Sequence, residues 1–218
     1  MSLEDAEQDR PSSNPQMQLR KVTDARTMRA LAHPVRIALV EALSLGGAMT
    51  ATEVGERIGE SPTTCSFHLR QLAKYGWVEE AGGGKGRARP WRIAAIGFSL
   101  SNTNDDPEID IAATTLSSLF QQRQLARYQT WQETKATYPR KWRNAATGSE
   151  YIFYLTADEL DQFTDEMHEL LMSRFPVERL TDPSKRPAGS VPVELLLFAY
   201  PMELPKPGDG PPAEEAER

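Results

Sequence analysis

The chain has 218 residues, of which 39% are hydrophobic and 26% charged, and its formal net charge is −6. This length permits one large domain or two small ones, with enough apolar residues for a core. The single cysteine excludes an intrachain disulfide. No apolar run approaches the roughly 20 residues of a membrane span, and no secretion signal opens the chain. These observations predict a soluble, cytoplasmic protein without a membrane partner.

The charges are unevenly distributed along the chain. Between Arg20 and Ile96, 12 Lys and Arg residues outnumber 7 Asp and Glu residues, so this stretch carries +5 and the remainder −11. Affinity for nucleic acid follows the local charge of a domain and not the average over the chain. A basic domain attached to an acidic remainder is therefore compatible with DNA binding.

The first hundred residues contain clear helix boundaries. Residues 1–20 are polar and rich in Ser, Pro and acidic groups, which predicts a disordered tail. Apolar residues then recur at helical spacing from Val22, and His33-Pro34 ends that helix and begins a second one, which stops at Gly46-Gly47. Together with the elements that follow, residues 21–97 are predicted to form one domain.

A helix-turn-helix is predicted in the middle of this domain. Thr50 and Glu53 form a capping box that opens a short helix through Ile58, and Gly59-Glu60 provides the turn. Ser61 is a suitable N-cap and Pro62 suits the first position of the next helix, predicted over residues 61–75.

The two faces of the helix over 61–75 differ in character. Cys65, Leu69 and Leu72 share one stripe, which predicts a core-facing side. The opposite side combines hydroxyls, cations and an aromatic ring, groups that can hold phosphates, guanine and thymine methyls in a DNA major groove. An ordinary amphipathic helix with one stray aromatic is the alternative. The candidate DNA-binding residues here are Ser61, Thr63, Thr64, Ser66, Phe67, Arg70 and Lys74.

A β-hairpin is predicted directly after this helix. Residues 77–80 and 90–93 are strand candidates joined by a glycine-rich loop over 82–89, which carries Lys85, Arg87 and Arg89. After a helix-turn-helix such a hairpin is a wing whose cations can reach the DNA backbone or minor groove. A mobile hairpin or a phosphate cradle is the alternative, although the loop lacks the Lys-Ser/Thr ending and the following helix of a P-loop.

The motifs over Leu31–Leu39, Ser61–Leu72 and Gly76–Val78 resemble the ArsR/SmtB-type winged-helix regulators. The resemblance covers about residues 22–96 and implies a homodimeric, DNA-binding transcription regulator, typically a bacterial repressor. Metal-sensing members of that family carry paired cysteines before the recognition helix, or Asp/His ligands in the C-terminal helix. This chain has neither set, so no metal site and no cofactor are expected.

A long helix is predicted after a linker over 98–107. Residues 108–138 contain neither Gly nor Pro and show an apolar stripe at helical spacing. In the resembling family the helix after the wing forms the dimer interface. The resemblance therefore implies dimerisation residues at Ile109, Leu116, Leu119 and Phe120.

A small C-terminal β-α-β unit is predicted over residues 146–204. Residues 151–155 and 191–200 are strand candidates, and a capping box at Thr156 and Glu159 opens a helix between them. Residues 205–218 are predicted to be a second disordered tail. The expected fold class is thus α+β and mainly helical: an N-terminal winged helix-turn-helix, a long dimerisation helix and the β-α-β unit.

These features favour a dimeric, sequence-specific regulator that binds double-stranded DNA. A protein-interaction module built on the winged helix is the alternative, followed by an enzyme based on the C-terminal unit. No catalytic residues are recognised, and an enzyme is not expected.

Any effector is expected to be a small organic molecule or a protein and not a metal ion. Aromatic residues concentrate in the second half of the chain, where they could line a cleft or, alternatively, form a core. They are Trp131, Tyr138, Trp142, Tyr151, Phe153, Tyr154, Phe163, Phe198 and Tyr200.

Overall fold

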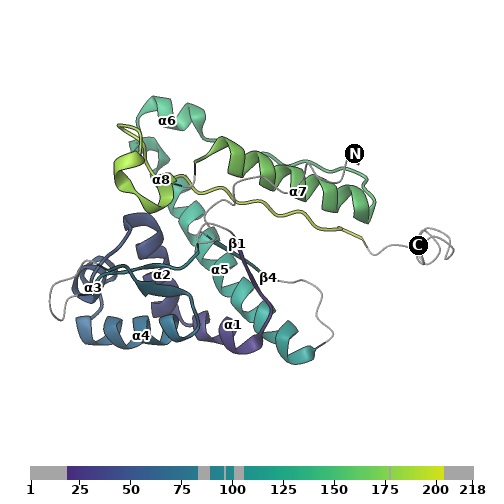
Figure 1. The fold of residues 1–218 in the computed structure, drawn as a ribbon. Helices are drawn as coiled ribbons and strands as arrows, with labels where there is room; N and C mark the ends of the chain where they lie inside the picture. Colours follow the sequence, from purple (N-terminus) through teal and green to yellow (C-terminus); the bar gives the residue numbers. More distant parts are fainter. Residues whose placement is uncertain (1–18, 83–88, 96, 101–105, 177, 204–218) are drawn as a thin grey trace, which may run out of the picture.

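The computed structural model describes residues 19–82, 89–95, 97–100, 106–176 and 178–203 (Figure 1). The winged domain comprises β1 (Leu19–Val22), α1 (Ala25–Leu31), α2 (Pro34–Gly46), α3 (Ala51–Ile58), α4 (Pro62–Lys74), β2 (Val78–Glu80), β3 (Trp91–Ile93) and β4 (Gly97–Leu100). The rest comprises α5 (Pro107–Thr134), η2 (Lys135–Thr137), α6 (Arg140–Ala145), α7 (Ala157–Arg174), α8 (Glu178–Thr181) and η3 (Pro183–Lys185). The protein is mainly helical, as expected.

Local capping fixes the start of the first two helices. The Asp24 side chain accepts a hydrogen bond from the Thr27 amide at the N-terminus of α1. His33 caps α2 in the same way, because its Nδ1 accepts from the Val35 amide at 3.2 Å and Pro34 occupies the first helical position. The predicted break at His33-Pro34 is confirmed.

The predicted helix-turn-helix is also confirmed. Thr50 and Glu53 form a complete capping box on α3, and the Ser61 hydroxyl accepts from the Thr64 amide on α4. Between the two helices Gly59 has φ +75°, a left-handed conformation that suits glycine. The helices approach so closely that a Cβ on Gly55 would lie 2.7 Å from the carbonyl oxygen of Glu60.

Two small sheets border the helices. Strands β2 and β3 pair antiparallel with Glu79 opposite Arg92, which confirms the strands of the predicted wing. Strands β1 and β4 pair parallel, with Leu19 opposite Gly97. This second sheet was not predicted, and β4 lies where a linker was expected, because two four-residue strands separated by most of a domain carry no local signal of their pairing.

The first half of α5 belongs to the core of the winged domain. Ala112, Ala113 and Leu116 are buried and pack in one cluster with apolar residues of α1, α2 and α4. Edge-to-face and tilted ring contacts of 5.1 Å connect Trp77 to Phe98 and Phe98 to Phe120, so the hairpin, β4 and α5 share one core.

The second half of α5 leaves this core. Figure 1 shows it running from the winged domain towards α6. The helix ends at Thr134, four residues before the expected end at Tyr138, and a 3-10 turn over Lys135–Thr137 then leads to Pro139, which caps α6. Pro139 disfavours the helical conformation at Tyr138, so the chain cannot continue as a helix beyond this point.

The expected C-terminal β-α-β unit is wrong in its strands. The helix is confirmed as α7, with the capping box of Thr156 and Glu159 in place. Residues 151–155 and 191–200, however, are extended without forming strands, and after η3 the chain is drawn as a thin line up to residue 203 (Figure 1). A strand needs a neighbour to share hydrogen bonds, and among the described residues neither segment has one.

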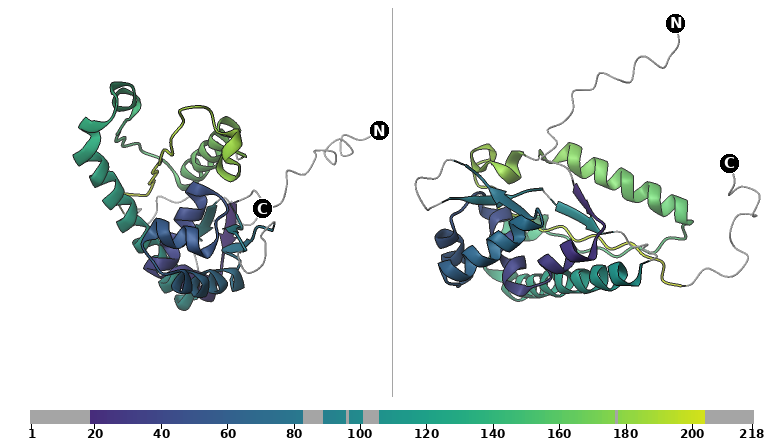
Figure 2. Two further views of the ribbon diagram at one scale, coloured as in Figure 1. Left: turned by 90° about the vertical axis from the view of Figure 1, so that its left-hand side faces the viewer. Right: turned by 60° about the horizontal axis from the view of Figure 1, so that its bottom comes forward.

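The helix α7 lies outside the group formed by α1 to α4 in the views of Figure 2. It packs extensively against no other helix or strand of the described chain. Among the described residues, no helix is both long enough and apolar enough to span a bilayer.

Candidate nucleic-acid interface

The outward face of α4 is exposed over its whole length. Thr63, Phe67, Arg70 and Lys74 are exposed, and the Phe67 ring is 57% accessible although it is apolar. The inward residues Cys65, Leu69 and Leu72 are fully buried. The structure therefore places these four candidate residues on one side of the helix, facing away from the core, as the helical spacing predicts.

The other candidate residues lie at the N-terminal end of α4. Ser61 is exposed, while Thr64 and Ser66 are partly buried, and the hydroxyls of Ser61 and Thr64 lie 2.8 Å apart. The Ser61 side-chain oxygen also accepts the N-cap hydrogen bond of α4, so Ser61 has a structural role.

Arg70 is the cation of this face that is available for base recognition. Its guanidinium forms no ion pair or hydrogen bond within the described part of the chain. Lys74 differs, since its ammonium lies 5.7 Å from the centre of the Tyr75 ring. A bidentate guanidinium suits the O6 and N7 atoms of guanine, whereas an ammonium at the end of the helix suits a phosphate.

In the described part of the wing, both arginines are paired with glutamates. Lys85 and Arg87 lie outside the described residues. Arg89 is exposed but forms an ion pair with Glu80 at 2.7 Å, and Arg92 forms one with Glu79 at 2.6 Å. Neither ion pair was predicted from the sequence, although a hairpin register that sets Glu79 opposite Arg92 indicates one of them.

Arg20 and Trp77 hold the C-terminal end of α4 in place. Arg20 donates hydrogen bonds to the carbonyl oxygens of Tyr75 at 2.9 Å and Gly76 at 2.6 Å, and it also lies over the Trp77 ring. The buried indole of Trp77 donates to the Thr27 carbonyl at 3.0 Å. Cations interact favourably with the unpaired carbonyl groups at a helix C-terminus. Arg20 therefore links β1 to the end of α4. No local pattern around Arg20 predicts this role.

The rings of Phe67, His68 and His33 contact one another in a row. The Phe67 and His68 rings meet edge to face at 5.2 Å, and His68 lies 4.8 Å from His33 at the α1–α2 junction. Burial is the main cause that lowers the pKa of His68, followed by the charges of His33 and Arg36, while Glu60 opposes them. The neutral form of the His68 ring is therefore favoured beneath the exposed face of α4.

Cys65 behaves as a buried apolar side chain. Its thiol is inaccessible, and burial together with the negative charge of Glu60 raises its pKa. A thiol that resists ionisation is a poor nucleophile and a poor metal ligand. Over the described residues, no group of three or more His, Cys, Asp or Glu side chains is arranged to hold a metal ion.

The residues expected to form the dimer contact lie against the protein's own core. Leu116 is fully buried there, and Ile109, Leu119 and Phe120 are partly buried against the same cluster. Dimerisation through them stays a prediction, but Leu116 has no surface left to offer a second subunit.

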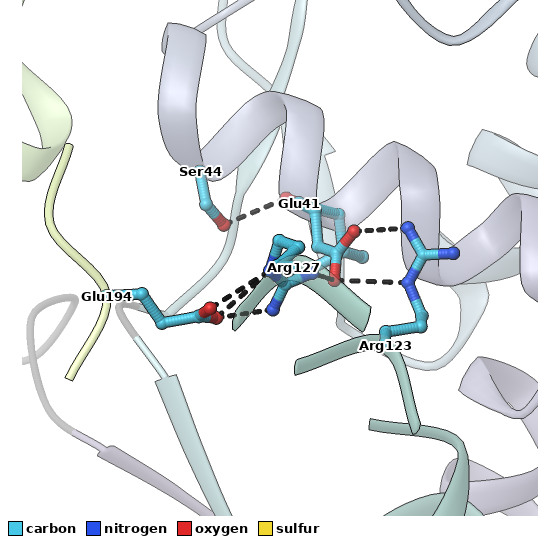
Figure 3. A network of polar contacts seen from close by, with 6 residues as sticks. Glu41, Ser44, Arg123, Arg127 and Glu194 are labelled. Atoms are coloured by element: carbon cyan, nitrogen blue, oxygen red, sulfur yellow. Dashed lines mark hydrogen bonds and ion pairs between the residues drawn. The ribbon is translucent and has the colours of Figure 1, made fainter. Parts of the chain in front are cut away.

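A network of charged groups joins α2, α5 and the C-terminal segment (Figure 3). Glu41 of α2 accepts hydrogen bonds from Arg123 and Arg127, and Arg127 also pairs with Glu194. Burial alone would raise the pKa of Glu41, but the two guanidiniums outweigh it and lower the pKa. The hydrogen bond to Glu194 is the main cause that raises the pKa of Arg127.

An open cavity of about 390 Å³ lies beside this network, between α2, α3 and α5. None of the aromatic residues of the second half of the chain, which were candidates for an effector site, lines this cavity. The lining consists of Ala38, Glu41, Ala42, Leu45, Arg57, Ile58 and Arg123.

Comparisons with known proteins agree with this geometry. Residues 31–81 match a family model described as a helix-turn-helix domain. A search of curated proteins found no match.

Three solved structures show partial likeness. The first is the homodimeric winged helix-turn-helix DNA-binding domain Mb0332 from Mycobacterium bovis, described as a possible ArsR-family regulator; it has 22% identity and a TM-score of 0.30, covering 44% of this chain and 77% of that one. The second is the transcriptional repressor BigR from Xylella fastidiosa, at 25% identity, TM-score 0.29 and coverage of 44% and 82%. The third is a MarR family transcription regulator, at 15% identity, TM-score 0.31 and coverage of 67% and 81%.

The helix-turn-helix family match and the observed α3–α4 turn with the β2–β3 hairpin show that the chain carries a winged helix-turn-helix domain. The family match covers α2, α3, α4 and β2, and the structure adds the second wing strand β3 and the helices α1 and α5 that pack against the same core. The fold implied by the resemblance to ArsR-type regulators is confirmed for this domain.

Proposed function

We propose that this protein is a transcription regulator that binds double-stranded DNA as a homodimer and acts as a repressor. In this proposal α4 enters the major groove and the wing contacts the backbone or minor groove. A second subunit would present a second α4, so that the dimer reads two half-sites.

The exposed face of α4 is the observation that carries the proposal. Phe67 and Arg70 project from it side by side with Thr63, and Arg70 has no partner within the described residues. The phenyl ring stands beside a hydroxyl and a guanidinium on this face, and a groove-binding helix can place such a ring against a thymine methyl and the guanidinium against guanine.

The test compares specific and random DNA. A DNA sequence that the wild-type protein prefers is first isolated from genomic fragments by gel shift, and the affinities for this site and for random DNA are then measured for Arg70→Ala. Since a guanine contact supplies discrimination, Arg70→Ala should lose roughly 1–3 kcal/mol on the preferred site and much less on random DNA.

Arg140→Ala on α6 is the matched control, because it removes an exposed arginine outside the winged domain. Its affinity for both DNAs should equal that of the wild type. Equal losses on both DNAs for Arg70→Ala would show that Arg70 contacts phosphate and reads no base.

A further inference from the structure

Two apolar segments of the C-terminal half, residues 151–155 and 191–200, are extended and exposed. Tyr154 is 102% exposed, Tyr151 74% and Val193 75%. Residues 151–155 are apolar or aromatic at every position, and residues 191–198 are interrupted only by Pro192 and Glu194. Continuous apolar runs of this kind are typical of strands that are covered on both faces.

The backbone of both segments lacks partners as well. Among the described residues, the amides and carbonyls of 151–155 and 191–200 form no hydrogen bond with other backbone groups. Exposed extended segments with free N–H and C=O groups and apolar side chains are templates for pairing with another chain.

The half of the chain that contains these segments has no core of its own. No described residue after Leu116 is buried. Helix α7 shares this state, since Leu160, Met167 and Leu171 are only partly covered and Phe163 is 42% exposed. Most helical stability in proteins comes from packing of an apolar face, so α7 and the two segments need a covering surface that the described residues of one copy do not supply.

The exposed area matches what a stable dimer buries. The five aromatic residues of the segments are each at least 53% exposed, and at about 150–250 Å² per ring they leave on the order of 700 Å² uncovered. The aliphatic residues add to this area. A specific dimer buries about 800 Å² on each partner, so the segments suffice for one protein interface.

The charge of the surface favours an identical partner. Glu194 is the single charged residue within the two segments, and Arg127 of the same chain neutralises it. In a two-fold interface a group that lies near the axis faces its own copy, so an unpaired charge there would repel its equivalent. The intrachain pair removes this repulsion.

We infer that residues 151–155 and 191–200 of two copies of this chain pair into one intermolecular β-sheet, which the two α7 helices cover. Two copies bring four apolar segments together, enough for a sheet that is stable when one face is packed against helices. The inference builds on the proposed dimeric regulator and names the surface that forms the dimer. Its test uses no DNA, so failure of the interface and failure of DNA binding are distinguishable.

The test measures association and amide protection on the full-length protein. Sedimentation should show a dimer, and hydrogen exchange read by mass spectrometry should show slow amides in peptides covering 151–155 and 191–200. Dilution that dissociates the dimer should make both peptides exchange fast, because their hydrogen bonds come from the partner.

Two substitutions separate the interface from the fold. Tyr154→Asp and Val193→Asp change residues that are exposed in the single chain, so the melting of the winged domain should stay as in the wild type. Each should weaken the dimer by at least about tenfold and abolish protection of both segments. Ile111→Asp is the control: it places the same charge on an apolar residue of α5 that is 63% exposed and outside the segments, and its dimer should be unchanged.

Four results would overturn the inference. They are a monomer at all concentrations, a dimer whose two segments exchange fast, protection that persists in monomeric Tyr154→Asp, and a dimer that dissociates with Ile111→Asp but not with Tyr154→Asp. Persistent protection would mean pairing within one chain, and the Ile111 result would place the interface on α5.

Discussion

His68 lies next to the exposed Phe67 ring, and its Nδ1 atom is buried with no hydrogen-bond partner among the described residues. Partial burial of the ring disfavours its charged form, and the charges of His33 and Arg36 add to this effect, so the pKa of His68 is lowered in the folded protein. The unfolded chain has an ordinary histidine pKa near 6.5 and therefore takes up this proton first.

The first prediction is a loss of stability in mild acid. Because the unfolded state binds the His68 proton at a higher pH, the free energy of unfolding should fall as pH drops below about 6.5 and should level off below the lowered pKa of the folded state. His68→Asn should flatten this dependence between pH 7.5 and 5.5. Urea unfolding at several pH values, with His168→Asn on α7 as control, measures it; an unchanged slope in His68→Asn would contradict the assignment.

Arg89 shows how a neighbouring residue limits a predicted DNA contact. Its guanidinium is held by Glu80, so a phosphate must compete with a carboxylate for it. The pair is exposed, which makes it weak in stability but still effective in cancelling charge.

The second prediction follows from releasing that cation. Glu80→Gln should strengthen binding to random DNA and steepen the dependence of log affinity on log salt by about one unit, the value for one added phosphate contact. Glu150→Gln makes the same charge change outside the winged domain and should alter neither quantity. Salt titrations by fluorescence anisotropy measure both, and an unchanged slope for Glu80→Gln would mean that Arg89 does not reach the DNA.

At the scale of elements, the α3–α4 turn sets the position of the recognition helix. Gly59 supplies the left-handed residue, and Gly55 allows the backbone of Glu60 to pass close to α3. In addition, Glu60 donates its amide to the Gly55 carbonyl at 2.9 Å, which ties the turn to the end of α3.

The third prediction concerns Gly55. Alanine normally stabilises a helix interior by up to about 1 kcal/mol relative to glycine. At this position its Cβ would lie 2.7 Å from a backbone oxygen that cannot rotate away, so Gly55→Ala should instead destabilise the domain by about 1–3 kcal/mol. Glu56→Ala changes an exposed neighbour on α3 and is the control. A Gly55→Ala protein as stable as the wild type would show that the backbone of Glu60 can move away from the added Cβ.

The elements that the sequence predicted correctly carry their signals locally. The capping boxes at Thr50 and Thr156, the Ser61-Pro62 start and the amphipathic stripe of α4 each lie within a few residues, so sequence alone located α3, α4 and α7. The recognition face followed from the same spacing. In contrast, the β1–β4 pairing, the Arg20 contacts and the Glu41–Arg127–Glu194 network join residues more than fifty positions apart. Local patterns contain no information about such contacts.

The strands expected over 151–155 and 191–200 also show that local patterns do not identify long-range contacts. Their apolar composition indicates that each segment suits a sheet, but composition does not say which strand lies beside it. The family resemblance implied a dimer contact at Leu116 by its position in the helix after the wing. Helical spacing shows only that this face is apolar, and the structure shows that the protein's own core covers Leu116.

At the scale of the whole molecule, Arg127 connects the winged domain to the proposed dimer interface. It binds Glu41 of α2 on one side and Glu194 of the apolar segment on the other. The guanidinium and both carboxylates are partly exposed, so the network should contribute little to stability, within about 1 kcal/mol. Its larger effect should be on the charge of the interface.

The fourth prediction tests that effect with a double-mutant cycle. Arg127→Gln leaves Glu194 unneutralised and should weaken the dimer, more at low salt than at high salt, while the melting of the winged domain changes little. Glu194→Gln should dimerise normally, and the double variant should recover most of the lost affinity. Sedimentation equilibrium measures all three, and a double variant as weak as Arg127→Gln would assign Arg127 another role.

The central claim, a dimer that reads DNA with two copies of α4, is tested most directly by selecting binding sites from random double-stranded DNA with the full-length protein and measuring how many chains bind each site. The claim predicts an inverted repeat whose half-sites are centred about 34–36 Å apart, one helical turn, or a multiple of it, bound by two chains. Enrichment of no sequence, or a single half-site bound by one chain, would contradict it.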